Sequence, residues 1–168
     1  MNEKMNRKMK VVCQWWELFH SDSKENFSKA GLAALHRCHS VSEVMFVPAY
    51  HQLVAMSRVE MTDTNTLHSL AVAAWVLSWV DENREVTFAE QIATSENPVR
   101  PVRFRRLLEC SSWDELGMQL IRMVRLMKNA ANVSDLSRGI LFWMSGTWIQ
   151  EQWALTYYAN VLEEKKNS

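Results

Sequence analysis

The sequence has few residues that turn or break the chain, with only four glycines and three prolines among 168 residues. A β-sandwich or a doubly wound sheet normally uses more of these residues in its turns, so their shortage favours helices joined by short connections. Apolar runs long enough to span a membrane are also missing. We therefore expect a soluble, helical protein that makes no contact with a membrane.

Cysteine is scarce as well. Cys13, Cys38 and Cys110 are odd in number, widely spaced and form no CxxC pair. Such a set is typical of reduced thiols in a cytosol and unlike a disulfide framework. The cysteines thus predict a cytoplasmic protein.

Patterns that indicate catalysis are missing too, since the chain has no nucleophile elbow, phosphate-binding loop or HExxH motif. The nearest approach to a metal site is the group of His36, Cys38, His39 and His51. His36 and His39 have the three-residue spacing of one helical face, but the helix start at Ser40 indicates that their helix ends there. No carboxylate or CxxC pair completes a set of metal ligands. We expect no catalytic residues, no metal and no cofactor.

Charge is balanced in total but not along the chain. There are 19 Lys and Arg residues and 19 Asp and Glu residues. Residues 60–99 hold seven acidic residues and one basic one, whereas residues 100–138 hold eight basic residues and four acidic ones. The chain is therefore dipolar along its sequence, and its basic part is the first place to look for an anionic partner.

Helix-start signals are plentiful and set the expected fold. The capping box, in which the cap and the third helical residue satisfy each other's amides, fits residues 40–43, 87–90, 112–115 and 147–150. Pro48 and Pro101 suit the first turn of a helix. These signals predict an all-α, compact bundle of about eight helices, the longer ones covering residues 9–20, 66–80, 113–129 and 148–164.

The domain organisation stays open between two descriptions. One is a single continuous domain. The other divides the chain within a linker at residues 94–101, which contains Pro98 and Pro101. It gives an N-terminal lobe of residues 1–97, acidic in its second half, and a C-terminal lobe of residues 98–168 with a basic face.

The clearest helical periodicity begins at Trp113. Its apolar positions share one face at 3.6-residue spacing, namely Leu116, Leu120, Met123, Val124 and Met127. Arg122 and Arg125 fall on the opposite face. In the preceding segment Arg103 and Arg106, three residues apart, project together away from an apolar face.

The last segment, residues 148–164, is apolar around much of its circumference. This pattern predicts that the last helix is central to the bundle. Tryptophans can stack on nucleic-acid bases, but most here fall among Leu, Val and Ala at helical spacing and are expected in the core, in particular Trp15, Trp16, Trp75, Trp79 and Trp143.

The basic stretch from Arg100 to Arg138 holds the main candidates for binding. Guanidinium groups match phosphate oxygens bidentately, so arginine pairs on the solvent side of consecutive helices can hold phosphates in register. The alternative is an ordinary solvated face, which mixed-charge helices often have. The nucleic-acid-binding candidates in this stretch are Arg103, Arg105, Arg106, Arg122, Arg125, Lys128 and Arg138.

Three ordered segments carry a resemblance to a known family. The first runs Ala33-Ala34-Leu35-His36-Arg37, then Ser42-Glu43-Val44 and Pro48-Ala49-Tyr50-His51-Gln52-Leu53. The second is Val102-Arg103-Phe104-Arg105-Arg106-Leu107-Leu108, and the third extends from Glu115-Leu116 through Leu120–Met127 and Leu141-Phe142-Trp143 to Tyr157-Tyr158. Their order, spacing and total length make the chain similar to the small-subunit family (CasB) of the type I-E CRISPR surveillance complex, Cascade.

The resemblance implies an all-α protein with two helical lobes that catalyses nothing. In the family two copies pack head to tail and contact the backbone subunits, the large subunit, the guide RNA–target DNA heteroduplex and the displaced strand. Arg37 matches the second of two paired basic residues, and His36 stands where the first usually is. Basic residues that often precede the last helix in the family are missing from residues 145–150.

The expected function is therefore binding to phosphate backbones, which stabilises guide–target pairing and the displaced strand in an RNA-guided antiviral complex. The alternative is a helical adaptor that docks on acidic protein surfaces and never touches nucleic acid. A helix-turn-helix regulator is disfavoured, because the basic residues are not concentrated at the start of one recognition helix.

Overall fold

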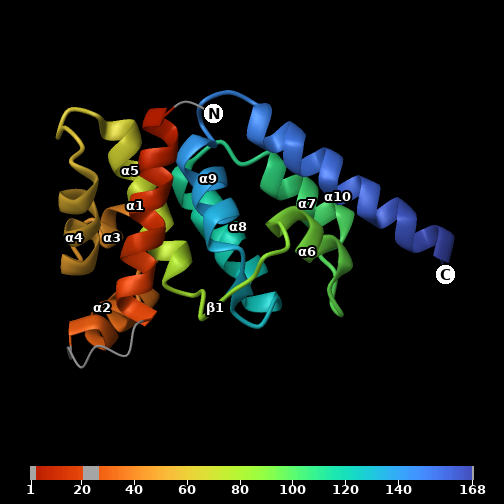
Figure 1. Cartoon of the computed structure of the whole chain (residues 1–168), viewed down its shortest axis with the longest axis horizontal. Helices are drawn as coiled ribbons and strands as arrows, with labels where there is room; N and C mark the ends of the chain where they lie inside the picture. Colours follow the sequence, from red (N-terminus) through yellow and green to blue (C-terminus); the bar gives the residue numbers. More distant parts are fainter. Residues whose placement is uncertain (1–2, 21–26, 168) are drawn as a thin grey trace.

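The computed structural model describes residues 3–20 and 27–167 and is dominated by helices (Figure 1). In chain order the helices are α1 (Glu3–His20), α2 (Phe27–His36), α3 (Val41–Val44), α4 (Pro48–Ser57), α5 (Thr64–Leu77), α6 (Phe88–Thr94), α7 (Pro101–Leu108), α8 (Trp113–Leu126), α9 (Val133–Phe142) and α10 (Trp148–Asn167). The strands in the described residues are β1 (Glu82–Asn83) and β2 (Ala130–Ala131). The predicted all-α class is confirmed, and the additional helices are short ones such as α3.

The helix starts follow the predicted chemistry at several positions. The hydroxyls of Ser40 and Ser112 accept hydrogen bonds from the amides of Glu43 (3.2 Å) and Glu115 (3.3 Å), so both cap their helices. Pro48 and Pro101 stand at the first positions of α4 and α7. The serine hydroxyls supply partners for amides that the helices themselves leave unpaired, and proline has no amide hydrogen that needs a partner, which is why the starts could be read from the sequence.

Helix α6 begins differently from its predicted capping box. Thr87 is at the cap position but makes no side-chain cap hydrogen bond. The first amide, that of Phe88, instead donates to Oδ2 of Asp135 at 2.9 Å. A carboxylate 47 residues away in sequence therefore replaces the local cap and ties α6 to α9.

The central helix of the fold is α5. Ten of its 14 residues are buried, and it packs against α8 and α9 as well as against α1, α3 and α4. The core around it is one continuous apolar cluster that includes Trp15, Trp75, Trp143 and Trp153. The expectation that most of the tryptophans lie in the core holds only in part: four of the eight are buried, Trp148 is exposed, and three are partly buried against the core, namely Trp16, Trp79 and Trp113.

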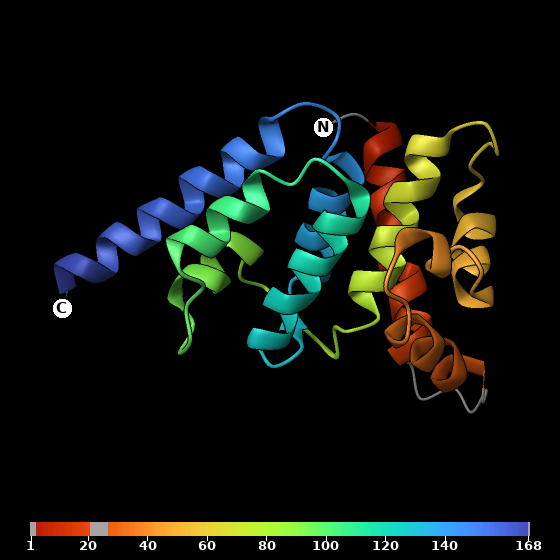
Figure 2. The ribbon, with the colours of Figure 1, turned by 180° about the vertical axis from the view of Figure 1, so that it is seen from behind.

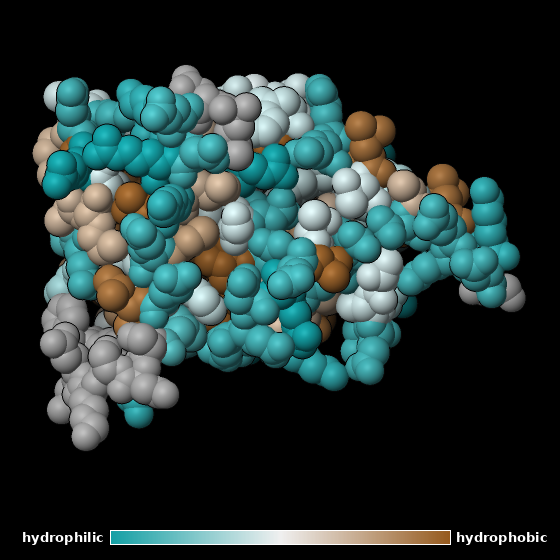
Figure 3. Space-filling model, in the orientation of Figure 1, coloured by the Kyte–Doolittle hydropathy of each residue, from teal (hydrophilic) through white to brown (hydrophobic). Residues whose placement is uncertain are grey.

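Helix α10 is not central, so that prediction is wrong. It runs along one edge of the molecule beside α6 and α7 (Figures 1 and 2). Only Ile149, Trp153 and Tyr157 are buried on it, whereas Leu155 and Leu162 are 76% and 59% exposed. The reason is that other helices pack against only one stripe of α10, so its remaining apolar residues face solvent. Figure 3 shows apolar patches on this edge of the molecule.

The connection after α5 contains one strand of a small parallel pairing. β1 pairs with β2, with Glu82 opposite Ala130 and Asn83 opposite Ala131. The amide of Asp81 also donates to the carbonyl of Asn129 at 2.7 Å. This pairing fixes the end of α8 beside the exit of α5. The division into two lobes near residue 98 stays a prediction.

Within residues 3–20 and 27–167, no helix is both long enough and apolar enough to cross a lipid bilayer.

Candidate nucleic-acid interface

Helices α7 and α8 present their arginines on the side opposite to the core. On α7, Phe104 and Leu107 are buried and Phe104 stacks on Tyr157 of α10 with ring centroids 3.9 Å apart. On α8, the apolar face at residues 116–124 is buried as the periodicity predicts. The arginines between these apolar positions are therefore forced to the surface, and all four are exposed, namely Arg103, Arg106, Arg122 and Arg125.

The fold brings these two arginine pairs around one depression, which we call the basic hollow. Its volume is about 580 Å³, and its lining residues come from α7 and α8. It is lined by Arg103, Arg106, Gln119, Arg122, Met123, Arg125 and Leu126. The lining contains four cationic side chains and no acidic one, so the hollow has a positive potential that attracts anions.

The arginines of the basic hollow are available to a ligand. None of the four forms an ion pair with any residue in the described ranges. By contrast, the neighbouring Arg105 pairs with Glu109 at 2.9 Å, and Lys128 pairs with Glu96 at 3.1 Å. Both of those pairs are well exposed, so solvent screens them and either cation can exchange its partner with little effect on stability.

Arg125 is also held by an aromatic residue. Its guanidinium carbon lies 5.0 Å from the ring centroid of Trp79, within the range of a cation–π interaction. The imidazole of His36 stacks on the same indole, with centroids 4.0 Å apart. The Nε2 of His36 is 2.7 Å from the carbonyl oxygen of Ser78, so this nitrogen carries the proton and donates. Trp79 thus orients Arg125 at the edge of the hollow.

The remaining predicted residues do not line the basic hollow. Arg37 is exposed just after the end of α2, and Lys128 has a left-handed backbone (φ 57°) after the end of α8. Arg138 is on α9, where its side chain is 18% exposed and bonds to Asp135 at 2.8 Å and to Gln152 at 2.5 Å. Nucleic-acid contacts by Arg37, Arg105, Lys128 and Arg138 stay predictions.

The histidines and cysteines near α2 and α4 take part in internal hydrogen bonds. The thiol of Cys38 donates to the carbonyl of Ala34 at 3.3 Å, and Nε2 of His51 lies 2.7 Å from the carbonyl oxygen of Met45. Burial raises the pKa of the Cys38 thiol above its ordinary value. In the part of the chain that the structure describes, no three His, Cys, Asp or Glu residues are placed to share a metal ion.

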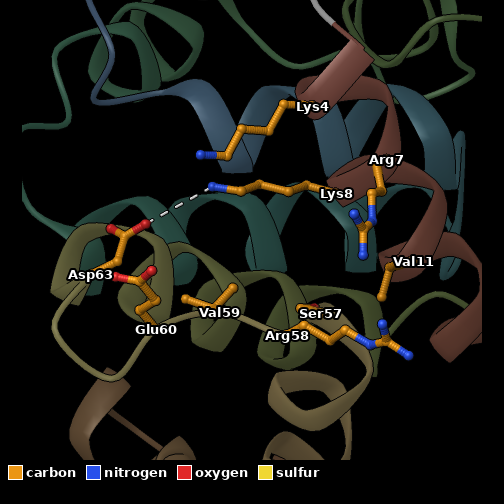
Figure 4. Close-up of a pocket in the computed structure, with 9 residues that line it drawn as sticks. All are labelled: Lys4, Arg7, Lys8, Val11, Ser57, Arg58, Val59, Glu60 and Asp63. Atoms are coloured by element: carbon orange, nitrogen blue, oxygen red, sulfur yellow. Dashed lines mark ion pairs between the residues drawn. The ribbon is translucent and has the colours of Figure 1, made fainter.

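Sequence reasoning overlooked a second group of basic residues, which surrounds a smaller hollow (Figure 4). Lys4, Arg7 and Lys8 come from the first turns of α1, and Arg58 follows α4. The basic start of the chain was a visible signal for the first three. Nothing local connects Arg58 to them, because the contact depends on how α1 and α4 pack.

Comparison with solved structures finds the same fold in a chain of a crystal structure described as E. coli Cascade bound to a PAM-containing dsDNA target with a 32-nt spacer. The TM-score is 0.69 at 15% sequence identity, and the match covers 92% of this chain and 96% of that chain. At this identity the likeness shows the fold alone. No curated protein sequence matches the chain.

The family comparison covers most of the sequence. Residues 31–158 match the family described as CRISPR-associated protein Cse2. The matched range includes the whole basic hollow and the segments that carry the resemblance noted from the sequence. This chain belongs to the CRISPR-associated protein Cse2 family.

Proposed function

We propose that this protein is a non-catalytic subunit of a Cascade-type, RNA-guided CRISPR complex, in which it binds nucleic acid through phosphate groups. The observation that carries the proposal is the basic hollow, where four arginines from two helices face one depression and none has an ion pair within the described residues. Family membership and the shared fold with a chain of E. coli Cascade support the same role.

The arrangement suits backbone binding better than base readout. Guanidinium groups recognise phosphate oxygens with two parallel hydrogen bonds, and such contacts position a nucleic acid without reading its sequence. The arginines of the hollow lie on the sides of two helices, within α7 and in the second half of α8, whereas a recognition helix contacts base edges with its N-terminal residues. Sequence specificity in the proposed complex then comes from pairing between the guide RNA and the target strand.

Weak contacts of this kind are sufficient for the proposed role. The exchange of a DNA duplex for a guide–target heteroduplex is nearly balanced in free energy, so protein contacts to phosphates can decide its direction. In the proposed complex the partners are the backbone and large subunits, a second copy of this chain, the guide RNA and the target DNA. The displaced strand and the heteroduplex are both candidates for the basic hollow.

The first experiment tests assembly. The chain is co-expressed with a tagged type I-E backbone subunit, the other Cascade subunits and guide RNA, and the purified complex is weighed by native mass spectrometry. Recovery of this chain in the complex is expected. Its absence from a complex that otherwise assembles would contradict the proposal, provided that the backbone subunit comes from the same system.

The second experiment tests binding to phosphates. Target affinity of the complex is measured against salt concentration for Arg122→Ala/Arg125→Ala. Each phosphate group that the variant no longer binds should lower the magnitude of the log–log slope by about 0.7–0.9. The matched control Lys165→Ala/Lys166→Ala removes the same charge from the last turn of α10 and should leave the slope unchanged.

The rival function is that of a protein adaptor, and the Arg122→Ala/Arg125→Ala variant distinguishes it from nucleic-acid binding. Arginines that dock on an acidic protein surface would be needed for assembly, so the Arg122→Ala/Arg125→Ala chain would be absent from the purified complex. Arginines that bind phosphate leave assembly intact and change only target affinity and its salt dependence.

A further inference from the structure

The smaller hollow lies between the first turns of α1 and the connection from α4 to α5 (Figure 4). Its volume is about 260 Å³. The residues that line it are Lys4, Arg7, Lys8, Val11, Ser57, Arg58, Val59, Glu60 and Asp63. Four of them are cationic and two are anionic, so the hollow carries an excess of positive charge. It belongs to different elements from the basic hollow of α7 and α8.

The acidic residues of this hollow are on one side, where Asp63 already has partners. The carboxylate of Asp63 accepts a hydrogen bond from the amide of Thr66 at 3.1 Å and caps α5. Lys8 donates to the hydroxyl of Thr66 at 3.0 Å and lies 4.0 Å from Asp63. The hydrogen bonds from Thr66, and then the charge of Lys8, lower the pKa of Asp63, which is therefore ionised at neutral pH. In Figure 4, Lys4 and Glu60 extend to this same side.

Arg7 and Arg58 occupy the other side. Their guanidinium groups lie near Val11, apart from both carboxylates (Figure 4). Both residues are exposed, and neither forms an ion pair with a residue of the described ranges. Glu60 and Asp63 offset only part of the positive charge of the hollow. The remaining charge is concentrated at the guanidinium groups of Arg7, from α1, and Arg58, from the end of α4.

The backbone at Arg58 shows how this pair is formed. Arg58 ends α4 in the left-handed conformation, with φ 50° and ψ 41°. Glycine is the residue that this helix-end position normally favours, because it has no Cβ to crowd the backbone. An arginine here turns the chain at the end of α4 and also directs a long cationic side chain to the space beside α1.

We propose that Arg7 and Arg58 form a second binding site for nucleic-acid phosphate, separate from the basic hollow. The inference rests on the proposed function, because it assumes that the anion presented to this chain is a nucleic acid. Two guanidinium groups match the oxygens of a phosphodiester by charge and by paired hydrogen bonds. A nucleic acid carries phosphates at regular intervals, so one bound molecule can supply ligands to two separate sites.

The variant Arg7→Gln/Arg58→Gly tests the site with little risk to folding. Glutamine is an adequate helix former at an exposed position, and glycine suits the left-handed backbone at residue 58. The assembled complex with this variant is compared with wild type for target affinity over a range of salt concentrations. We expect the magnitude of the log–log slope to fall by about 0.7–0.9 for each phosphate group that the site no longer binds.

The control Lys165→Gln/Lys166→Gln removes an equal charge elsewhere and should not change the slope. If Arg122→Ala/Arg125→Ala lowers the slope and Arg7→Gln/Arg58→Gly does not, this second site is wrong and the proposed function stands. If neither variant changes the slope, the proposed function itself fails. Absence of the Arg7→Gln/Arg58→Gly chain from the complex would also overturn the site, because it would identify the anion as a carboxylate of a neighbouring protein.

Discussion

The guanidinium of Arg138 donates a hydrogen bond to Oδ1 of Asp135 at 2.8 Å, one turn earlier on α9. The second oxygen of this carboxylate accepts the amide of Phe88 at the start of α6. Asp135 is 9% exposed and the Arg138 side chain is 18% exposed. One carboxylate therefore neutralises a partly buried cation and caps a helix that is distant in sequence.

We expect Asp135→Ala to lower the free energy of unfolding by about 3 kcal/mol, because it leaves a partly buried guanidinium without its counter-charge and a buried amide without a partner. Urea unfolding followed by circular dichroism measures the change. The control is Glu82→Ala, whose pair with Arg84 is exposed on both sides and should contribute at most about 0.5 kcal/mol. Equal effects of the two substitutions would show that Asp135 has no special role in stability.

Gly117 of α8 provides a second prediction, in which packing opposes helix propensity. In an exposed helix, Gly→Ala stabilises by about 1 kcal/mol. A Cβ at Gly117, however, would lie 2.6 Å from ring atoms of Trp75 on the central helix α5. We expect Gly117→Ala to destabilise by about 1–3 kcal/mol because α5 and α8 must move apart.

Gly31→Ala is the matched control for this substitution. Its Cβ would approach Ala49 and Phe19 at 3.2 Å, a contact that small shifts relieve. The helix-propensity gain then offsets the strain, and the melting temperature should change little. A stabilising effect of Gly117→Ala would show that the contact of α8 with α5 is looser than the structure indicates.

Much of the fold could be predicted from local chemistry. Ser40 and Ser112 cap helices where the capping box predicts them, and the apolar periodicity of α8 correctly separates its buried face from Arg122 and Arg125. These features depend on residues within one or two turns, which the sequence displays directly. The all-α class follows from the same signals.

Tertiary placement was harder to predict. The apolar circumference of residues 148–164 predicts a central α10, but periodicity only describes a helix surface and does not say how many neighbours cover it, and Leu155 and Leu162 are exposed. The arginine pairs of α7 and α8 could be identified in the sequence, whereas their common hollow depends on how the two helices pack. Arg7 and Arg58 are separated by 50 intervening residues, so no local pattern joins them.

A third prediction concerns the contact between Arg125 and Trp79 at the edge of the basic hollow. A double-mutant cycle with Arg125→Ala, Trp79→Leu and the combined variant isolates the cation–π interaction from the packing of the indole. We expect a coupling free energy of about 0.5–1 kcal/mol in stability, as for exposed pairs. A coupling near zero would show that the two side chains move independently in solution.

The last prediction is a decrease in stability at high pH that comes from buried acidic groups. Burial raises the pKa of the Cys110 thiol from 9.0 to about 11, with a smaller contribution from the charge of Glu115. Burial also raises the pKa of Tyr50 and of Tyr157 from 10.0 to about 12, and the hydroxyl of Tyr157 donates to the carbonyl of Val99. In the unfolded chain all three groups ionise at their ordinary values.

Between pH 9 and about 11 the folded state therefore keeps a proton on Cys110 that the unfolded state has released. Because the folded state binds more protons, the free energy of unfolding must fall as pH rises through this window, and it is unaffected by this group below pH 9. Denaturant unfolding at a series of pH values should show this fall, which should be smaller for Cys110→Ala. Cys110→Ala should retain the part of the fall in unfolding free energy that begins near pH 10, where Tyr50 and Tyr157 ionise in the unfolded chain. Identical pH profiles for wild type and Cys110→Ala would mean that the thiol is accessible to water in solution and ionises at its ordinary pKa.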